Sequence, residues 1–324
     1  MYANQEIEQL GREAMRKLQT ERLKRALSWA GEKSLFYQRK FSMAKVSPDD
    51  FKNLEDIEKF PFTTSKELAE TPGSELLTLP FSSIARVALW EHPQYAIHYY
   101  TQNDIAANVE MLTRAVVAAG VTRASIVGIL GDMADSGLMD IQSALELVGA
   151  TVILLSTEYD RAITLLGVAS TDVIVGSARR IMRFIIQVQA DGKDIADYPI
   201  HKIICLNEAL QNPLKSHIER RTGTEVYSLF SSAVFGSVGM MYQCDGHIGQ
   251  HVAEDYFYPE IVAFGSDEII TSSSVMGELV LTTLTNEAMP IIRGRTGQPA
   301  MLMDAPCSCG RTMIRLNTPT AAFG

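Results

Sequence analysis

Four residues suited to binding a metal ion stand in two blocks in the last third of the chain. Cys244 is followed after six residues by His251, and a single residue separates Cys307 from Cys309. Three thiolates and one imidazole are the ligand set of a closed, tetrahedral structural zinc site. The sequence therefore predicts a structural Zn²⁺ that staples two distant segments, because four protein ligands leave no coordination position for a substrate.

The sequence leaves two alternatives to this ligand set open. His247 lies between Cys244 and His251 and could replace His251 as the nitrogen ligand. The cysteines could also be buried thiols without a metal, since free cysteine commonly packs as a small hydrophobic residue. Cys205 lies inside an apolar run and is expected to be a core residue of that kind.

Residues for nucleophilic or phosphate chemistry do not form a familiar catalytic pattern. The chain contains no G-x-S-x-G, H-E-x-x-H, G-x-G-x-x-G or G-x-x-x-x-G-K-(S/T) motif. Ser231 and Ser232 follow an apolar run and could donate hydrogen bonds to a ligand, although a turn at the end of a strand is the commoner reason for such residues. Arg293 and Arg295 either pair with acidic residues of the body or offer their guanidinium groups to an anionic ligand.

The elements that must position these residues belong to a large globular chain. Its 324 residues are 46% hydrophobic and carry a formal net charge of -9, which predicts a large core in one large or two ordinary domains. A negative chain has no general attraction for nucleic acid or anionic lipid. The sequence shows no signal peptide and no membrane span, and four cysteines are too few for a disulfide scaffold. We therefore expect a cytoplasmic protein without nucleic-acid or membrane partners.

Three regions with different patterns follow one another along the chain. Residues 1–75 predict a helical lead-in, with apolar residues at helical spacing over residues 4–30. Residues 76–240 predict αβ subdomains in which a parallel sheet is covered by helices. Residues 241–324, which hold the predicted zinc site, favour a separate antiparallel sheet or barrel packed beside the first. The predicted parallel strands are residues 125–130, 151–155, 172–176, 202–206 and 225–229, and the helices between them include residues 137–148 and 179–189.

Several separated segments resemble, in the same order, the phenylacetate-CoA ligase branch of the adenylate-forming, or AMP-binding, superfamily. They include Ser34–Phe41 (family S-P-F-Y-R-x-x-F), Leu54–Leu68 (L-E-D-L-x-x-L-P-F-T-T-K-x-x-L), Tyr100–Asp104 (Y-T-x-x-D), Leu147–Ile153 (L-G-A-T-V-I), Glu254–Glu260 (E-D-H-F-Y-P-E) and Arg293–Gln298 (R-x-R-T-G-D). The resemblance implies an α/β fold, the N-terminal domain of such an enzyme. Stacked αβ subdomains with a mostly parallel sheet would pack beside a smaller β subdomain, with the active site at their junction. The chain stops at Gly324, so we expect the family's small C-terminal domain and its catalytic lysine to be absent.

The residues that match the family's nucleotide site are mostly changed. The family's Gly/Ser/Thr-rich phosphate loop corresponds to Trp90–Tyr99, which contains none of these residues. The motif that begins at Tyr227 has Ser231 where the family has a magnesium-binding glutamate, and a hydroxyl is a poorer ligand for a hard cation. Glu208 alone is kept from the family's adenine-side G-(A/G)-E-P. Gln298 replaces the aspartate that binds both ribose hydroxyls, and an amide has one acceptor oxygen and two donors.

These changes predict a homologue that cannot adenylate a carboxylate alone and that retains a binding role. The ligand would be a small aryl, acyl or nucleotide molecule in the old cleft, or a partner protein, and ATP, AMP and Mg²⁺ are not expected as cofactors. The alternative is an active AMP-forming acid-CoA ligase with a divergent ATP loop. A third alternative is a purely structural or regulatory subunit. The resemblance also raises a homodimer.

Overall fold

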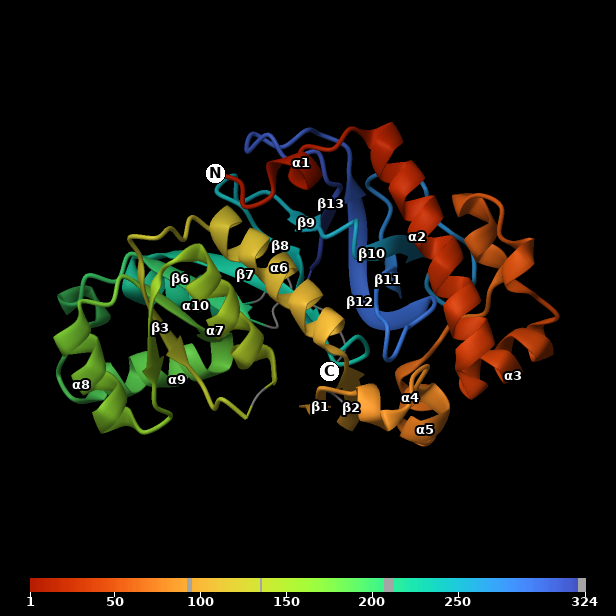
Figure 1. Ribbon diagram of the computed structural model, residues 1–324. Coiled ribbons are helices and arrows are strands. Elements are labelled where there is room, and N and C mark those ends of the chain that lie inside the picture. The colour runs from red at the N-terminus through yellow and green to blue at the C-terminus, as the bar shows by residue number, and fades with distance from the viewer. Residues whose placement is uncertain (92–94, 135, 207–212, 320–324) are drawn as a thin grey trace.

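The computed structural model describes residues 1–91, 95–134, 136–206 and 213–319, which form two lobes joined along one continuous sheet (Figure 1). One lobe carries the parallel strands and the helices α7 to α10, and the other carries the antiparallel strands and the N-terminal helices. Helix α6 (Gln102–Ala118) crosses the molecule between them. Within the described residues, no helix is long and apolar enough to cross a membrane.

Five parallel strands form one half of the sheet, in the order β7-β6-β5-β3-β4. The strands are β3 (Ile126–Leu130), β4 (Thr151–Leu155), β5 (Val173–Ser177), β6 (Lys202–Leu206) and β7 (Glu225–Ser232), connected by α7 (Ser136–Val148), α8 (Tyr159–Ala169), α9 (Ala178–Ala190) and α10 (Pro213–Thr222). All five predicted strands and both predicted helices are confirmed to within a few residues. In β5, Val173 and Val175 face one apolar cluster and Ile174 faces another, so this strand is buried on both faces.

The antiparallel strands continue the same sheet in the order β10-β11-β12-β13-β9-β8-β7. They are β8 (Ser237–Tyr242), β9 (Gln250–Val252), β10 (Phe257–Val262), β11 (Gly277–Thr283), β12 (Gly294–Met303) and β13 (Arg315–Asn317). The expectation of a separate antiparallel sheet was wrong, because these strands belong to the same sheet as the parallel ones. The mixed α/β fold itself is confirmed. The turn at Ala233–Gly236 lets β8 fold back antiparallel onto β7. The sheet then continues through β9 and β13 to β12, which pairs with β13 over residues 301–303 and with β11 over residues 294–300. The residue boundaries of the three predicted regions stay a prediction.

The lead-in is helical as predicted, but its first helix is broken. Residues 4–30 form α1 (Gln5–Glu8) and most of α2 (Arg12–Lys33), with a break at residues 9–11. The remaining helices are α3 (Leu35–Ala44), α4 (Ser65–Glu70) and α5 (Gly73–Leu76), with short 3₁₀ turns at Pro48–Asp50, Leu54–Lys59, Phe81–Ser83 and, later, Ile195–Asp197. Thr64 begins α4 with a capping box, because its side chain accepts from the Glu67 N–H while Glu67 accepts from the Thr64 N–H. Helix α2 lies along β10 and β11 (Figure 1) and buries Leu23 and Leu27 in their shared core.

Buried ion pairs join the segments that resemble the known family. Asp255 accepts two hydrogen bonds from Arg114 of α6, at 3.0 and 3.2 Å. Glu260 accepts two from Arg293, at 2.8 and 3.1 Å. Arg293 also donates to the carbonyl of Phe60 at 2.8 Å. The structure therefore decides between the two roles left open for Arg293, because its guanidinium is buried and paired within the body.

Candidate functional site

The four predicted metal ligands come together at one end of the antiparallel half. Cys244 follows β8, His251 lies in β9, and Cys307 and Cys309 lie in the loop between β12 and β13. Their ligand atoms all lie within 4.8 Å of one another. The Sγ atoms of Cys244 and Cys307 are 3.5 Å apart, and the Sγ of Cys309 is 3.4 Å from Nε2 of His251.

These separations fit a tetrahedral zinc site. Zinc–sulfur bonds of about 2.3 Å and zinc–nitrogen bonds of about 2.0 Å place tetrahedral ligand atoms roughly 3.5–3.8 Å apart. His251 is also set up as a ligand, because its Nδ1–H donates to the carbonyl of Met313 at 3.3 Å and leaves the Nε2 lone pair directed at the sulfurs. A hydrogen bond from the Cys244 thiol, together with the His251 ring, lowers the pKa of Cys309, and the same hydrogen bond raises the pKa of Cys244.

The structure also separates the alternatives to this ligand set. His247 lies outside the cluster, and its ring packs against Tyr227 with centroids 4.6 Å apart. Cys205 is fully buried in β6 among apolar residues, as expected. Of the two histidines considered, His251 is therefore the residue that faces the cysteines.

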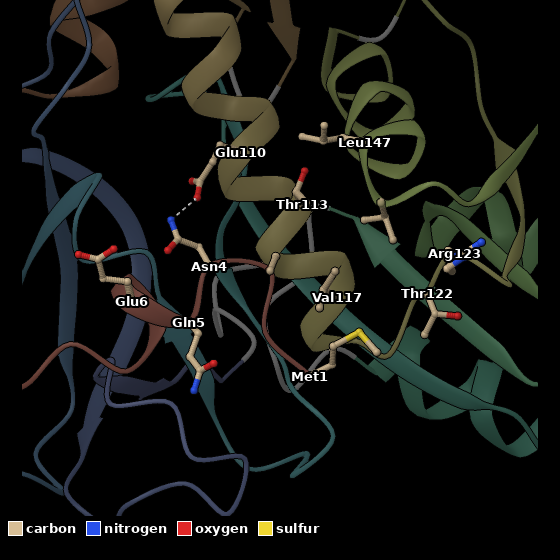
Figure 2. A pocket seen from close by; sticks show the side chains of 12 residues that line it. Met1, Asn4, Gln5, Glu6, Glu110, Thr113, Val117, Thr122, Arg123 and Leu147 are labelled. Carbon is tan, nitrogen blue, oxygen red and sulfur yellow. Dashed lines mark hydrogen bonds between the residues drawn. The ribbon is translucent and has the colours of Figure 1, made fainter.

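The N-terminal segment holds the loop that carries two of the cysteines. The hydroxyl of Tyr2 donates to the carbonyl of Cys309 at 2.7 Å, and the buried guanidinium of Arg311 pairs with the buried carboxylate of Glu8. Arg311 also donates to the carbonyl of Met1 at 2.8 Å. This segment and α6 enclose a cavity of about 790 Å³, which Figure 2 shows with Asn4 reaching Glu110 across one side. The sequence analysis did not predict the pair of Glu8 and Arg311, because the two residues lie more than 300 positions apart and no local pattern connects them.

Two of the residues that match the family's nucleotide site, Tyr227 and Gln298, take part in internal hydrogen bonds. Tyr227 is buried, and its hydroxyl lies 3.2 Å from the carboxylates of both Glu225 and Asp245. Ser231 lies near the end of β7, half-buried. Gln298 in β12 donates from its side-chain amide to the carbonyl of Pro319 at 2.6 Å and to that of Pro299 at 3.1 Å. Glu208 lies outside the described residues.

A pair of antiparallel strands, called the hairpin below, stands at the position of the family's phosphate loop, and residues 92–94 between the strands lie outside the described residues. Its strands are β1 (Arg86–Glu91) and β2 (Tyr95–Tyr100), which pair antiparallel. The Nε2–H of His98 donates to the carbonyl of Ala233 at 2.7 Å, and the hydroxyl of Tyr100 donates to that of Gly236 at 2.6 Å. A Cβ added to Gly236 would lie 2.4 Å from the His98 ring and 2.5 Å from the Tyr100 hydroxyl, so the hairpin and this turn are in tight contact. The only local indication of these contacts is the spacing of two residues that places His98 and Tyr100 on the same face of β2.

The burial of His98 predicts a pH dependence of stability. Burial lowers the pKa of His98 to about 4, whereas an unfolded histidine titrates near 6.5. Below about pH 6.5 the unfolded chain binds a proton that the folded chain excludes, so the free energy of unfolding falls as the pH falls towards 4. Between pH 7 and pH 5 this histidine should contribute a loss of about 2 kcal/mol.

Urea unfolding of the wild type and of His98→Gln at the two pH values measures this contribution. Glutamine keeps a donor for the Ala233 carbonyl but does not titrate. The difference in unfolding free energy between pH 7 and pH 5 should therefore be smaller in the variant by about 2 kcal/mol. An equal pH dependence in both proteins would show that His98 is not buried as described.

Restoring the family's aspartate at position 298 should destabilise this chain, because Gln298 donates hydrogen bonds within the fold. Gln298→Asp removes both donors and places a carboxylate beside the carbonyls of Pro299 and Pro319. We expect the free energy of unfolding to fall by about 1–3 kcal/mol. Gln298→Glu, which keeps the length of the side chain, should lose a similar amount. Thermal unfolding checks this, and an aspartate variant as stable as the wild type would contradict it.

The fold matches solved structures of acyl-CoA ligases. A 2-hydroxyisobutyryl-CoA ligase, solved in an open conformation with 2-HIB-AMP and CoA, matches with a TM-score of 0.88 over 96% of this chain and 75% of that chain, at 19% identity. A benzoate-CoA ligase from Burkholderia xenovorans matches with a TM-score of 0.53 over 71% of this chain and 48% of that chain, at 15% identity. The chain therefore has the fold of the adenylate-forming ligases.

Among the enzymes with this fold, the relatives found by sequence are phenylacetate-coenzyme A ligases. The chain is 28% identical over 316 residues to the phenylacetate-coenzyme A ligase of Thermus thermophilus, covering 96% of this chain and 71% of the relative. It is 29% identical over 317 residues to the Escherichia coli enzyme of the same name, covering 96% and 72%. No family model matches the chain. The chain is thus a relative of the phenylacetate-CoA ligases, and the resemblance seen in its motifs is confirmed.

Proposed function

We propose that this chain does not by itself form an acyl adenylate, and that it is a non-adenylating relative of the acid-CoA ligases with a ligand- or partner-binding role. One observation carries the proposal. At two of the positions that match the nucleotide site, Tyr227 and Gln298, the side chains are engaged in hydrogen bonds within the chain. Forming an adenylate requires a cradle of donors for a highly charged triphosphate.

The hairpin supports this proposal at the phosphate position. A phosphate cradle is normally built from backbone N–H groups of a glycine-rich loop that are free to face the anion. Here β1 and β2 pair with each other, and His98 and Tyr100 donate to carbonyls of the Ala233–Gly236 turn. These two side-chain donors are therefore occupied, and a side chain at Gly236 would have no room beside them.

Gln298 supports the same proposal at the ribose position. Both hydrogens of its amide group are accounted for by the carbonyls of Pro299 and Pro319, at 3.1 and 2.6 Å. An aspartate would have presented two acceptor oxygens to the ribose hydroxyls, whereas this amide holds residue 319 against β12. The substitution therefore has a role in the fold that does not involve a nucleotide.

ATP–pyrophosphate exchange with a panel of aryl and fatty acids tests the proposal. Exchange should stay at background in the zinc-loaded chain at saturating Mg²⁺ and ATP. The Escherichia coli relative, assayed in parallel with phenylacetate, shows that the assay detects turnover. Clear turnover with any acid would overturn the proposal and establish the rival function, an active AMP-forming acid-CoA ligase. The similarity to phenylacetate-CoA ligases over 96% of the chain is the observation that favours this rival.

We also propose that the cysteine and histidine cluster holds a structural Zn²⁺ through Cys244, His251, Cys307 and Cys309. The support is the ligand set, the separations of the ligand atoms and the hydrogen bond that orients His251. A zinc thiolate site needs reduced cysteines, which agrees with the cytoplasmic setting expected from the sequence. Elemental analysis of protein produced in zinc-supplemented medium should give one zinc per chain, and a metal-free protein with free thiols would contradict the assignment.

Native mass spectrometry of the purified chain separates the remaining alternatives. A binding protein should carry a small molecule or take one up on addition. A purely structural or regulatory subunit should instead co-purify with another polypeptide. A homodimer would appear as a second charge series at twice the mass of the chain. The ligand, the partner protein and the homodimer remain proposals drawn from the family.

A further inference from the structure

A second cavity lies between α2 and the loop that connects β11 to β12, and none of the nucleotide-matching residues lines it. Its volume is about 610 Å³, which is within the range of small-molecule sites. Trp29 forms part of its wall and Leu284 part of its apolar floor. Lys24 and Arg25, from the preceding turn of α2, also line it, together with Asn286.

The loop that lines this cavity is held in place by several hydrogen bonds. The indole N–H of Trp29 donates to the carbonyl of Glu287 at 3.0 Å. Asp104 accepts from the backbone N–H groups of Glu287 and Ala288, at 2.7 and 3.1 Å. The cavity is therefore bounded by a long helix and a fixed loop, which is the kind of rigid support that a binding site needs.

Two basic and two acidic residues line the cavity, and they differ in the partners that they have within the protein. Lys24 and Arg25 are exposed, and neither forms an ion pair within the described part of the chain. The carboxylate of Glu287 accepts from Thr101 at 2.8 Å and from Asn103 at 2.9 Å, so its charge is already solvated by the protein. Glu32 is the other acidic lining residue, and it lies about 10 Å along the helix from Arg25 at 1.5 Å per residue.

We propose that this cavity binds an aromatic anion, with the aromatic ring against the indole of Trp29 and the negative group at Lys24 and Arg25. An indole offers a large stacking surface, and an adjacent pair of cations favours a carboxylate or phosphate on the same ligand. Asn286 adds an amide that can donate to or accept from the ligand. The proposal does not depend on the loss of adenylation, because none of these residues belongs to the nucleotide-matching set.

Intrinsic fluorescence offers a direct test, because the chain contains only two tryptophans, Trp29 and Trp90. The variant Trp90→Phe leaves Trp29 as the sole reporter. Benzoate and AMP serve as probes, since they carry a carboxylate and a phosphate respectively, and benzyl alcohol and adenosine serve as their uncharged counterparts. We expect saturable quenching by at least one anion, with binding at least tenfold weaker for its uncharged counterpart.

Charge variants distinguish this site from non-specific attraction. Lys24→Gln/Arg25→Gln in the Trp90→Phe background should weaken binding of the anion about tenfold, which corresponds to the loss of two exposed charge contacts. The control Lys17→Gln/Lys193→Gln removes the same charge from exposed positions outside the cavity and should leave the affinity unchanged. Absence of saturable quenching by either probe, or equal weakening in both double variants, would overturn the proposal. Calorimetry on the wild-type chain checks that the Trp90 substitution did not cause a negative result.

Discussion

Cys309→Ser is expected to lower the free energy of unfolding of the zinc-loaded chain by more than about 4 kcal/mol, the effect of losing a ligand bound at a thousand times its dissociation constant. The cluster joins the β8–β9 segment to the β12–β13 loop, which lie more than 50 residues apart in the sequence. Without the metal, this end of the sheet depends on β9 and β13, each of only three residues. Urea unfolding, with zinc content measured on the same samples, gives the effect.

A second cysteine provides the matched control for this experiment. Cys205→Ala alters a buried cysteine outside the cluster and should cost about 1 kcal/mol, as a small core truncation does. Its zinc content should stay at one per chain, while that of Cys309→Ser should fall. If both variants lost the same small amount of stability and the wild type held no metal, the cysteines would be core residues and the zinc assignment would fail.

Arg293→Met is expected to lower the free energy of unfolding by about 3–5 kcal/mol, because it leaves the buried carboxylate of Glu260 without its partner. Burial raises the pKa of Glu260, and Arg293 opposes that effect. The variant also removes the donor to the Phe60 carbonyl and the contact of the guanidinium with the Phe62 ring, 3.8 Å from its centroid. Urea unfolding measures the loss.

Two further variants distinguish the loss of the buried ion pair from the general effect of replacing an arginine with methionine. Arg16→Met breaks the exposed pair with Glu55, whose side chains are 51% and 69% exposed, and should change stability by less than about 1 kcal/mol. Arg293→Met/Glu260→Leu removes both charges and should recover part of the loss. A loss for Arg293→Met no larger than that for Arg16→Met would mean that the buried pair of Arg293 and Glu260 does not stabilise the fold.

Local sequence patterns were sufficient for the parts of the fold that depend on near neighbours. The five parallel strands are short β-branched runs between helical segments, and each was found where the pattern placed it. The continuity of the sheet was not predictable in the same way, because it depends on how the turn at Ala233–Gly236 returns β8 onto β7. The break between α1 and α2 was not predicted either, because the helical spacing of apolar residues continues across it.

For the candidate site, too, the sequence predicted the residues that a local pattern connects and did not predict the long-range contacts. The cysteine and histidine spacing predicted a cluster that the structure brings together, and it did so because ligand chemistry allows few residue types. The bonds of His98 to Ala233 and of Gln298 to Pro319 join residues 135 and 21 positions apart. Motif comparison identified the altered letters at these positions, but only the folded chain shows which groups their side chains contact.

Calorimetric titration of the zinc-loaded chain with MgATP is the most direct test of the central claim, that residues at the former nucleotide site are engaged within the protein. We expect no saturable heat at ATP concentrations that saturate the Escherichia coli relative, and no ATP–pyrophosphate exchange in the same preparation. Tight, stoichiometric binding of MgATP would contradict this claim, because in the structure His98, Tyr100 and Gln298 donate to the carbonyls of Ala233, Gly236 and Pro319.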